Sequence, residues 1–376
     1  MSGAVEQEAG TTVSVATGLG PDYAVIVEPG ALDRLPVLLS EFAPAHRYAL
    51  ISDDTVFGLH GDRVMSLLAG TALQVEPFTF PAGEASKTRD TWAELTDRML
   101  EARFGRDSVV IALGGGVTGD VAGFVAASYM RGVPVVQIPT SLVAMIDASV
   151  GGKTGVDTPA GKNLVGAFHP PRLVLVDPNL VTTLPRAERA QGLVEAVKHG
   201  AIMDLTYLED LERSMAVLLE AESGALTRAV ARSVELKASV VSQDEREGGL
   251  RQILNFGHTL AHAIEAAAGY EVPHGSAVAL GMILEARLGE ALGITVPGTS
   301  ERLRRVVRSL EIPEHLPPGA TPGEIMSYLG SDKKARRGEA RFVLLSELGA
   351  VSREDGWSRP VPAAAIEEIL TAAVTT

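Results

Sequence analysis

The chain has 376 residues, of which 46% are hydrophobic and 21% charged, and it is long enough for two domains that each bury a core. Its formal net charge of −14 excludes nucleic acid as an expected partner, because a phosphate backbone is bound by basic surfaces. The absence of cysteine excludes disulfides, thiolate ligands and a cysteine nucleophile, so a metal ion would need histidine and carboxylate ligands.

The start of the chain does not look like a targeting segment. Residues 1–10 include Glu6 and Glu8 and have neither the basic start nor the apolar core of a secretory signal. No stretch of the sequence is apolar for long enough to span a membrane. We therefore expect a cytoplasmic protein that has no membrane partner.

Short β-branched runs alternate with helical patterns in the first half of the chain, which predicts an α/β domain. The runs predict strands at residues 23–27, 47–52, 74–80, 108–113 and 135–138. Residues 86–103 predict a helix with one shared face, made of Trp92, Leu95, Met99 and Leu100.

After Pro185 the pattern is almost wholly helical to about residue 292. We therefore predict a Rossmann-like α/β N-terminal domain over residues 1–185. A mainly α-helical C-terminal domain is predicted over residues 186–376.

A glycine-rich turn follows the strand predicted at residues 108–113. It reads Gly114-Gly115-Gly116-Val117-Thr118-Gly119-Asp120, and residues 121–128 after it look helical. Glycines let a backbone approach a pyrophosphate closely, and a helix N-terminus supplies unpaired N–H groups. The spacing is equally compatible with a plain tight turn, but we expect the N-terminal domain to bind NAD.

The usual acidic ribose ligand is missing from the end of the next strand, where Gln137-Ile138-Pro139-Thr140 stands instead. Asp53, which follows the earlier strand at residues 47–52, could take that role if the strands are ordered differently. The sequence therefore predicts NAD binding without the ordinary Rossmann strand order.

Residues 251–262 are predicted to form one helix with a polar stripe. Four polar residues share a face of that helix at spacings i, i+4, i+7 and i+11, namely Arg251, Asn255, His258 and His262. A solvated surface is the simpler interpretation. The combination is unusual beside so many alanines, however, and favours an inward-facing functional stripe.

Two further residues suggest a metal site. His274 stands at a predicted helix start, and Glu195 is an acid on the otherwise apolar face of a predicted helix. Two histidines, one carboxylate and an open position are typical of a catalytic zinc-type site. Each histidine alone is more often structural, but the set together favours a metal site in the C-terminal domain.

Several lysines near these segments predict a focused anion-binding pocket in an otherwise acidic chain. Any one of them could be an ordinary solvated lysine, an interpretation that is weakest for Lys153 and Lys162, which stand among glycines. The set comprises Lys153, Lys162, Lys198, Lys237, Lys333 and Lys334.

From about Asp53 to Leu345, these segments resemble the 3-dehydroquinate synthase family, with the motifs in the family's order. The residues that carry the resemblance are 114–120, 129–132, 139–142, 147–155, 161–169, 195–198, 250–262, 274–275 and 332–334. Three residues depart from the family's usual choice, since Ser141 replaces Thr, His199 replaces Tyr and Ser276 replaces Glu.

The resemblance implies a role for each of these groups. The metal ligands would be Glu195, His258 and His274, the three that the spacing also favours, and zinc and cobalt both accept such ligands. NAD contacts would come from Asp53, Glu84, Lys87, Gly115, Gly116, Val117, Asp120, Thr140, Ser141, Lys153, Lys162 and Thr183. Substrate contacts would come from Asp147, Lys153, Lys162, Asn163, Lys198, Lys237, Arg251, Asn255, His262 and one of Lys333 or Lys334.

Arg131 resembles an arginine that reaches the substrate phosphate of the neighbouring subunit, which implies a homodimer. The implied reaction belongs to the shikimate pathway of aromatic amino acid biosynthesis and converts a sugar phosphate into 3-dehydroquinate and phosphate. A hydroxyl is transiently oxidised, phosphate is eliminated, the ketone is reduced again and an intramolecular aldol step closes the ring. His262 would handle a proton near the departing phosphate.

Other functions remain open at this point. Sister cyclases make valiolone, deoxy-inosose or aminoshikimate rings, and Arg251, Asn255 and His262 favour a carboxylate-bearing substrate over the first two. A metal-dependent polyol dehydrogenase would share the glycine turn and metal site without needing the lysines. A catalytically dead NAD-binding scaffold would have no need of an intact metal triad.

Overall fold

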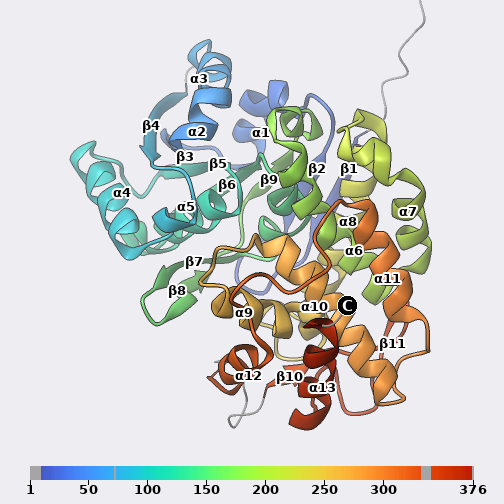
Figure 1. Ribbon diagram of the computed structural model, residues 1–376. Coiled ribbons are helices and arrows are strands. Elements are labelled where there is room, and N and C mark those ends of the chain that lie inside the picture. Colours follow the sequence, from blue (N-terminus) through green and yellow to red (C-terminus); the bar gives the residue numbers. More distant parts are fainter. Residues whose placement is uncertain (1–9, 72, 332–339, 375–376) are drawn as a thin grey trace, which may run out of the picture. The chain divides into compact units, whose positions relative to one another are not determined.

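The computed structural model describes residues 10–71, 73–331 and 340–374 (Figure 1). Its contacts divide the chain into two compact units. The first contains residues 1–185 and 221–245, and the second contains residues 186–220 and 246–376. The break after Pro185 lies where the change in pattern predicted it, but the chain later returns to the first unit.

The returning segment is helix α8 (Ser223–Gln243), which the sequence assigned to the second domain. It packs against strands β1 (Thr11–Val15) and β2 (Tyr23–Val27) of the first unit. Helical periodicity shows that α8 has a buried face, but it does not show which core that face covers. The assignment of these residues to the second domain is therefore wrong.

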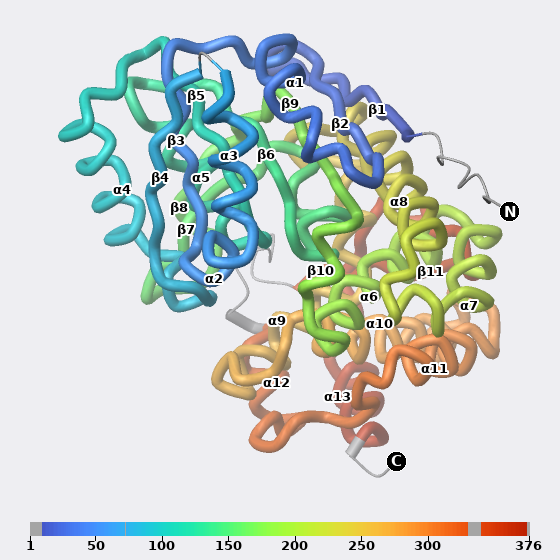
Figure 2. The backbone as a smooth tube through the Cα atoms, turned by 90° about the horizontal axis from the view of Figure 1, so that it is seen from above, coloured from blue at the N-terminus to red at the C-terminus, as the bar shows by residue number. Residues whose placement is uncertain are grey.

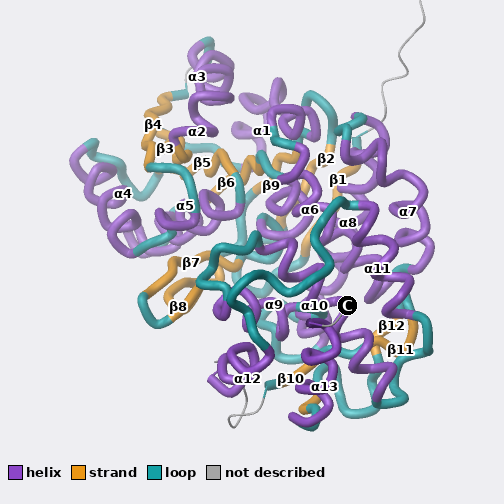
Figure 3. Tube along the Cα trace, in the orientation of Figure 1, coloured by secondary structure: helices purple, strands orange, loops and turns teal. Residues whose placement is uncertain are grey.

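The first unit is built on a seven-stranded sheet within the described residues, and Figure 3 shows its strands in orange. Only β1 runs antiparallel to its neighbour, and the other pairs are parallel. In spatial order the strands are β1, β2, β9 (Leu173–Val176), β6 (Val135–Pro139), β5 (Ser108–Gly114), β3 (Arg47–Asp53) and β4 (Gln74–Phe80). The five predicted strands are confirmed, and β1 and β9 were missed.

The strand order departs from the ordinary Rossmann order, as the missing acidic residue suggested. Counted from β3, the five parallel strands β3, β4, β5, β6 and β9 lie in the order 2-1-3-4-5. After β3 the chain forms β4 on one side of β3, and it then crosses back to form β5 on the other side of β3. Such a reversal is the place where open α/β sheets bind ligands, beyond the carboxyl ends of the strands. Here those ends are Asp53 and Gly114.

Helices and a hairpin complete the first unit (Figure 2). Besides α8, the described helices are α1 (Leu35–Phe42), α2 (Asp54–Val56), α3 (Asp62–Ala69), α4 (Arg89–Glu101) and α5 (Gly116–Ser128). Short 3₁₀ or π turns lie at Ala31–Arg34, Phe57–Gly61, Glu84–Ser86, Tyr129–Arg131, Ala144–Ala148 and Pro178–Thr183. The unpredicted hairpin pairs β7 (Lys153–Thr158) with β8 (Gly161–Phe168).

One apolar core joins α4 and α5 to the sheet. Leu95 and Met99 of α4 are buried there as predicted, and Trp92 packs against the core. Leu100 is 51% exposed, so its predicted place on the buried face is wrong. Leu100 follows Met99 by one residue and therefore points about 100° away around the helix.

The second unit is mainly helical. Its helices are α6 (Arg186–Met203), α7 (Leu205–Leu219), α9 (His258–Ala267), α10 (His274–Ala291), α11 (Thr299–Ser309), α12 (Pro322–Ser331) and α13 (Ala363–Val374), with a 3₁₀ turn η7 (Leu250–Asn255). Two small antiparallel pairs join β10 (Arg341–Phe342) to β13 (Arg359–Pro360) and β11 (Leu345–Glu347) to β12 (Ala350–Val351).

Helix α10 is the centre of this unit, since it packs against α6, α9, α11 and α13. Almost all of its residues from Gly275 to Gly289 are buried, which explains why it lacks the one-sided pattern of a surface helix. In the described part of the chain, no helix combines the length and apolar character that crossing a bilayer requires.

The first unit should respond to pH through His169, whose Nε2 lies 2.8 Å from the carbonyl oxygen of Val133. Burial lowers the pKa of His169, the Val133 carbonyl partly opposes this, and Arg172 lowers it further. The folded state therefore favours the neutral ring. The neutral ring therefore contributes to the free energy of unfolding. This contribution is fully present above the pKa of about 6.5 that His169 has in the unfolded chain, and it is lost as the pH falls through the lower pKa of the folded state.

We expect the unfolding temperature to fall as the pH is lowered from about 6.5 toward about 5, and to fall less in His169→Gln. Scanning calorimetry across this range measures the difference, with the exposed His46→Gln variant as control. An equal pH dependence in the native and His169→Gln proteins would contradict the assignment.

Candidate functional site

The glycine turn lies at the switch point of the first unit. Strand β5 ends at Gly114, and α5 begins at Gly116 with Gly115 as its N-cap. Asp53 at the end of β3 reaches this turn, because its Oδ2 accepts a hydrogen bond from Thr118 Oγ1 at 3.0 Å. The same carboxylate accepts the N–H of Val56 at 2.9 Å. An acid and a helix N-terminus thus meet at the predicted ligand-binding edge.

The segment after β6 joins the same edge. The N–H of Thr140 donates to the carbonyl of Gly114 at 2.9 Å. A Cβ atom on Gly115 would stand 3.3 Å from Ser141 Oγ, so these two residues are adjacent. Tertiary structure therefore brings the predicted residues Asp53, Gly115, Gly116, Thr140 and Ser141 together, with Val117 on the first turn of α5.

A buried ion pair stands beside this turn. The Nζ of Lys87 lies 2.6 Å from Asp120 Oδ2, and Lys87 is only 5% exposed. Burial alone would lower the pKa of Lys87, but the carboxylates of Asp120, Glu84 and Asp157 outweigh burial and hold that pKa above its usual value. Lys87 is therefore a permanent cation at neutral pH.

The remaining predicted residues of the first unit are spread over several elements. Lys162 on β8 faces Glu84 at 3.4 Å, and Lys237 of α8 contacts Asp147 Oδ1 at 2.8 Å. Three others are exposed, namely Arg131, Lys153 and Asn163. Thr183 is exposed as well, and its Oγ1 lies 3.0 Å from His60 Nε2.

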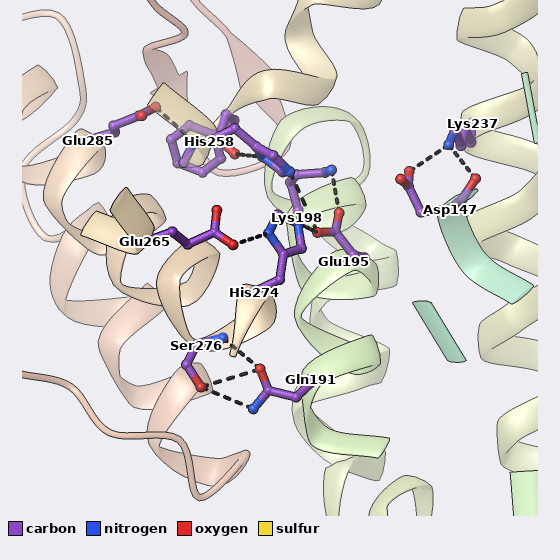
Figure 4. A network of polar contacts seen from close by, with 12 residues as sticks. Asp147, Gln191, Glu195, Lys198, Lys237, His258, Glu265, His274, Ser276 and Glu285 are labelled. Carbon is purple, nitrogen blue, oxygen red and sulfur yellow. Dashed lines mark hydrogen bonds and ion pairs between the residues drawn. The ribbon is translucent and has the colours of Figure 1, made fainter. Parts of the chain in front are cut away.

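The second unit holds the predicted metal ligands together (Figure 4). Glu195 on α6 is 2% exposed, and its Oε1 lies 3.8 Å from His258 Nε2 and 3.9 Å from His274 Nε2. One ligand atom from each of the three residues lies within 4.8 Å of the others. Both Glu195 oxygens are buried without a hydrogen bond, although Lys198 Nζ makes an ion pair with Oε2.

These residues fit a divalent cation. Ligand atoms about 2.1 Å from a tetrahedral ion lie about 3.4 Å apart, close to the separations seen here. The Nδ1 of His258 faces the carbonyl of Phe256 at 3.2 Å, and that of His274 faces Glu265 Oε1 at 3.4 Å. A proton on each Nδ1 leaves both Nε2 lone pairs directed at the Glu195 carboxylate.

The continuous helix predicted at residues 251–262 is wrong. The 3₁₀ turn η7 ends at Asn255, and α9 begins only at His258 after Gly257, whose φ is 79°. A Cβ on Gly257 would lie 2.9 Å from the backbone nitrogen of Met282, so α10 leaves no room for one. His258 and His274 nevertheless lie together with Glu195, although the predicted local geometry around His258 was wrong.

His262 lies beside these ligands, and Arg251 and Asn255 precede His258 in the chain. The His262 ring centroid lies 5.6 Å from that of His258 and 6.3 Å from that of His274. Arg251 is 2% exposed on η7, and Asn255 Nδ2 donates to Glu247 Oε1. Lys333 and Lys334 lie outside the described residues.

Four polar residues around the cluster were not predicted from the sequence, namely Gln191, Glu247, Glu265 and Glu285. Gln191 Oε1 accepts the N–H of Ser276 at 2.7 Å, which joins α6 to the first turn of α10. Glu265 and Glu285 could have been found, because both are acids in Ala- and Leu-rich helices, the signal that identified Glu195.

Family profiles and curated proteins give a consistent match. A profile described as 3-dehydroquinate synthase N-terminal matches residues 77–191, and one described as 3-dehydroquinate synthase C-terminal matches residues 192–335. The 3-dehydroquinate synthase of Symbiobacterium thermophilum is 44% identical over 331 residues, 88% of this chain and 92% of that protein. That of Nostoc punctiforme is 40% identical and covers 93% of this chain and 96% of the relative.

Solved structures are similar over almost the whole chain. A 2-deoxy-scyllo-inosose synthase complexed with carbaglucose-6-phosphate, NAD+ and Co2+ superposes with a TM-score of 0.88 at 26% identity, covering 96% of this chain and 100% of that one. A 2-epi-5-epi-valiolone synthase from Streptomyces hygroscopicus subsp. jinggangensis with NAD+ and Zn2+ gives 0.86 at 31%, covering 96% and 99%. A glycerol dehydrogenase from Schizosaccharomyces pombe, covering 92% and 87%, shares only the fold, at 16% identity and a TM-score of 0.66.

The turn at Gly257 should be intolerant of any side chain. We expect Gly257→Ala to destabilise the protein by more than the roughly 1–3 kcal/mol of a strained backbone, because the new Cβ would also collide with α10. Urea denaturation measures the loss, with Gly269→Ala as control. Gly269 also has a positive φ, of 63°, but nothing lies within 4 Å of its Cβ position. Equal losses in the two variants would contradict the steric argument.

Proposed function

Because this chain belongs to the 3-dehydroquinate synthase family, we propose that it converts 3-deoxy-D-arabino-heptulosonate 7-phosphate into 3-dehydroquinate and phosphate. The observation that carries this proposal is the cluster of Glu195, His258 and His274, with its ligand atoms within 4.8 Å of one another. In the same unit lie Arg251, Asn255 and His262, the residues expected to favour a carboxylate-bearing substrate. The reaction serves aromatic amino acid biosynthesis.

Two cofactors complete the proposal. Glu195, His258 and His274 would hold a zinc or cobalt ion, and the switch point at Asp53 and the glycine turn would hold NAD. When bound, the metal supplies a Lewis acid for a substrate hydroxyl, and NAD takes up and returns a hydride without net oxidation. Two solved relatives, one with NAD+ and Co2+ and one with NAD+ and Zn2+, support this pairing.

The chain's own residues bind and orient the substrate in this proposal. Lys153, Lys162 and Lys237 supply positive charge for substrate anions, and Asp147 fixes Lys237 through their 2.8 Å contact. Lys198 and Arg251 neutralise substrate anions from buried positions, where a charge is screened less by water. His262 exchanges a proton near the phosphate, and Asn255 keeps a fixed orientation through Glu247.

In this proposal the active form of the enzyme is a homodimer in the cytoplasm. Phosphorylated intermediates and NAD are held inside the cell, which supports the location. Arg131 follows Met130 in a turn where both have positive φ, and its side chain is exposed on the described surface. It would serve the substrate of the partner subunit. Sedimentation equilibrium should therefore give twice the 39.4 kDa mass of one chain, and a monomer at working concentrations would refute the dimer.

Related cyclases and polyol dehydrogenases remain the alternatives that an assay must separate. We expect phosphate release from 3-deoxy-D-arabino-heptulosonate 7-phosphate with catalytic NAD and zinc, without accumulated NADH, because the hydride returns to the product. Malachite green and absorbance at the NADH band follow the two products. Release of phosphate only from an amino-substituted or carboxylate-free sugar phosphate would instead assign the activity of a sister cyclase to this chain. Stoichiometric NADH from a polyol would indicate a dehydrogenase.

Glu195→Gln should weaken metal binding and activity together, because a neutral amide is a poorer ligand for a dication. We expect a loss of affinity larger than the roughly 10- to 100-fold that follows removal of an outer partner of a ligand. Competition with a zinc-sensitive dye measures this loss. Glu188→Gln, exposed on the same helix, is the control. Full activity in Glu195→Gln would contradict the role of Glu195 as a metal ligand.

A further inference from the structure

Two buried carboxylates beside the metal-ligand cluster have no role in the reaction described above. Glu265 on α9 is 2% exposed, and Glu285 on α10 is 0% exposed. An ionised carboxylate is retained in such a place only when its oxygens are satisfied by donors or cations. Both residues contact a segment that carries a proposed ligand.

Glu285 holds the turn that presents His258. Its Oε2 accepts the N–H of Gly257 at 2.8 Å, and its Oε1 accepts the N–H of Leu260 at 3.3 Å. These two donors lie immediately before His258 and two residues after it. The carboxylate also sits at the positive N-terminal end of α9. Glu285 therefore links the backbone on both sides of His258 to the central helix α10.

Glu265 acts on the other histidine, at the ring itself. Its Oε1 lies 3.4 Å from Nδ1 of His274, while Nε2 of that ring faces Glu195 at 3.9 Å (Figure 4). A carboxylate that accepts the Nδ1 proton fixes both the tautomer and the direction of the ring, and it makes the opposite nitrogen a stronger donor to a cation.

We propose that Glu265 and Glu285 are positioning residues for the metal site, Glu265 through the His274 ring and Glu285 through the backbone around His258. The inference rests on the proposed function, because it takes Glu195, His258 and His274 as ligands. It goes beyond that function in assigning the outer partners that set ligand geometry. The two residues differ in mechanism, so their loss should give different signatures.

The chain offers a matched control in Glu290, which also lies on α10. Its carboxylate accepts the N–H and the hydroxyl of Ser300, both at 2.8 Å, near the start of α11. Glu290 therefore anchors a helix start as Glu285 does, but the helix that it anchors carries no proposed ligand. An effect shared by Glu285→Gln and Glu290→Gln is structural, and an effect confined to Glu285→Gln concerns the metal.

The experiment compares the native chain, E265Q, E285Q and E290Q in three measurements. These are the unfolding temperature without metal, the Zn2+ dissociation constant from dye competition, and the visible absorption of bound Co2+, which reports ligand geometry. We expect E265Q to weaken Zn2+ binding by about 10- to 100-fold and to shift the Co2+ bands, with little change in the metal-free unfolding temperature. E285Q should lower both affinity and unfolding temperature. E290Q should lower only the unfolding temperature.

Native-like Zn2+ affinity and Co2+ bands in E265Q would overturn the role of Glu265, and equal affinities in E285Q and E290Q would overturn that of Glu285. If E285Q does not fold, Glu285→Asp, which keeps the charge, takes its place in the same comparison. Absence of Zn2+ binding by the native chain would refute the metal site of the proposed function. Tight native binding that the variants leave unchanged would refute only the inference made here.

Discussion

The arrangement of the second unit depends on one buried carboxylate. Glu195 is enclosed in α6 at 2% exposure, and removing an ionised carboxylate from water costs several kcal/mol unless positive partners surround it. Lys198 supplies one such partner from the next turn, and the Nε2 atoms of His258 and His274 face the other oxygen. A divalent cation among these atoms would complete the compensation. Helix α10, which begins at His274, accordingly packs against both α6 and α9.

The first unit follows a different constraint, which comes from sheet topology. The strand order reverses between the parallel neighbours β3 and β5, and such a switch point opens a place for a ligand at their carboxyl ends. Asp53, the glycine turn and Thr140 come from three strands that are far apart in sequence and adjacent in space. The glycines have a packing reason as well as a binding one, since a Cβ on Gly114 would meet Thr118 Oγ1 at 2.4 Å.

Local signals predicted the elements well where a single rule applied. The strand at residues 108–113 was found because a fully buried parallel strand is a continuous apolar run. The helix at His258 was predicted to begin seven residues too early, because periodicity treats an interrupted segment as one helix. The break depends on the positive φ of Gly257 and the closeness of Met282, and neither is visible in the spacing of polar residues.

The sequence by itself determined the chemistry that this protein can contain: acidic charge, no thiolates, a glycine turn after a buried strand, and two histidines and one acid in apolar helical surroundings. These are properties of composition and of short-range periodicity, which the chain carries before it folds. Tertiary structure decided which residues meet. It returned α8 to the first unit, put Glu285 against the start of α9 and set the Glu195 carboxylate 3.8 Å from His258. Such pairings depend on which buried faces pack together, and that choice is made by the whole core.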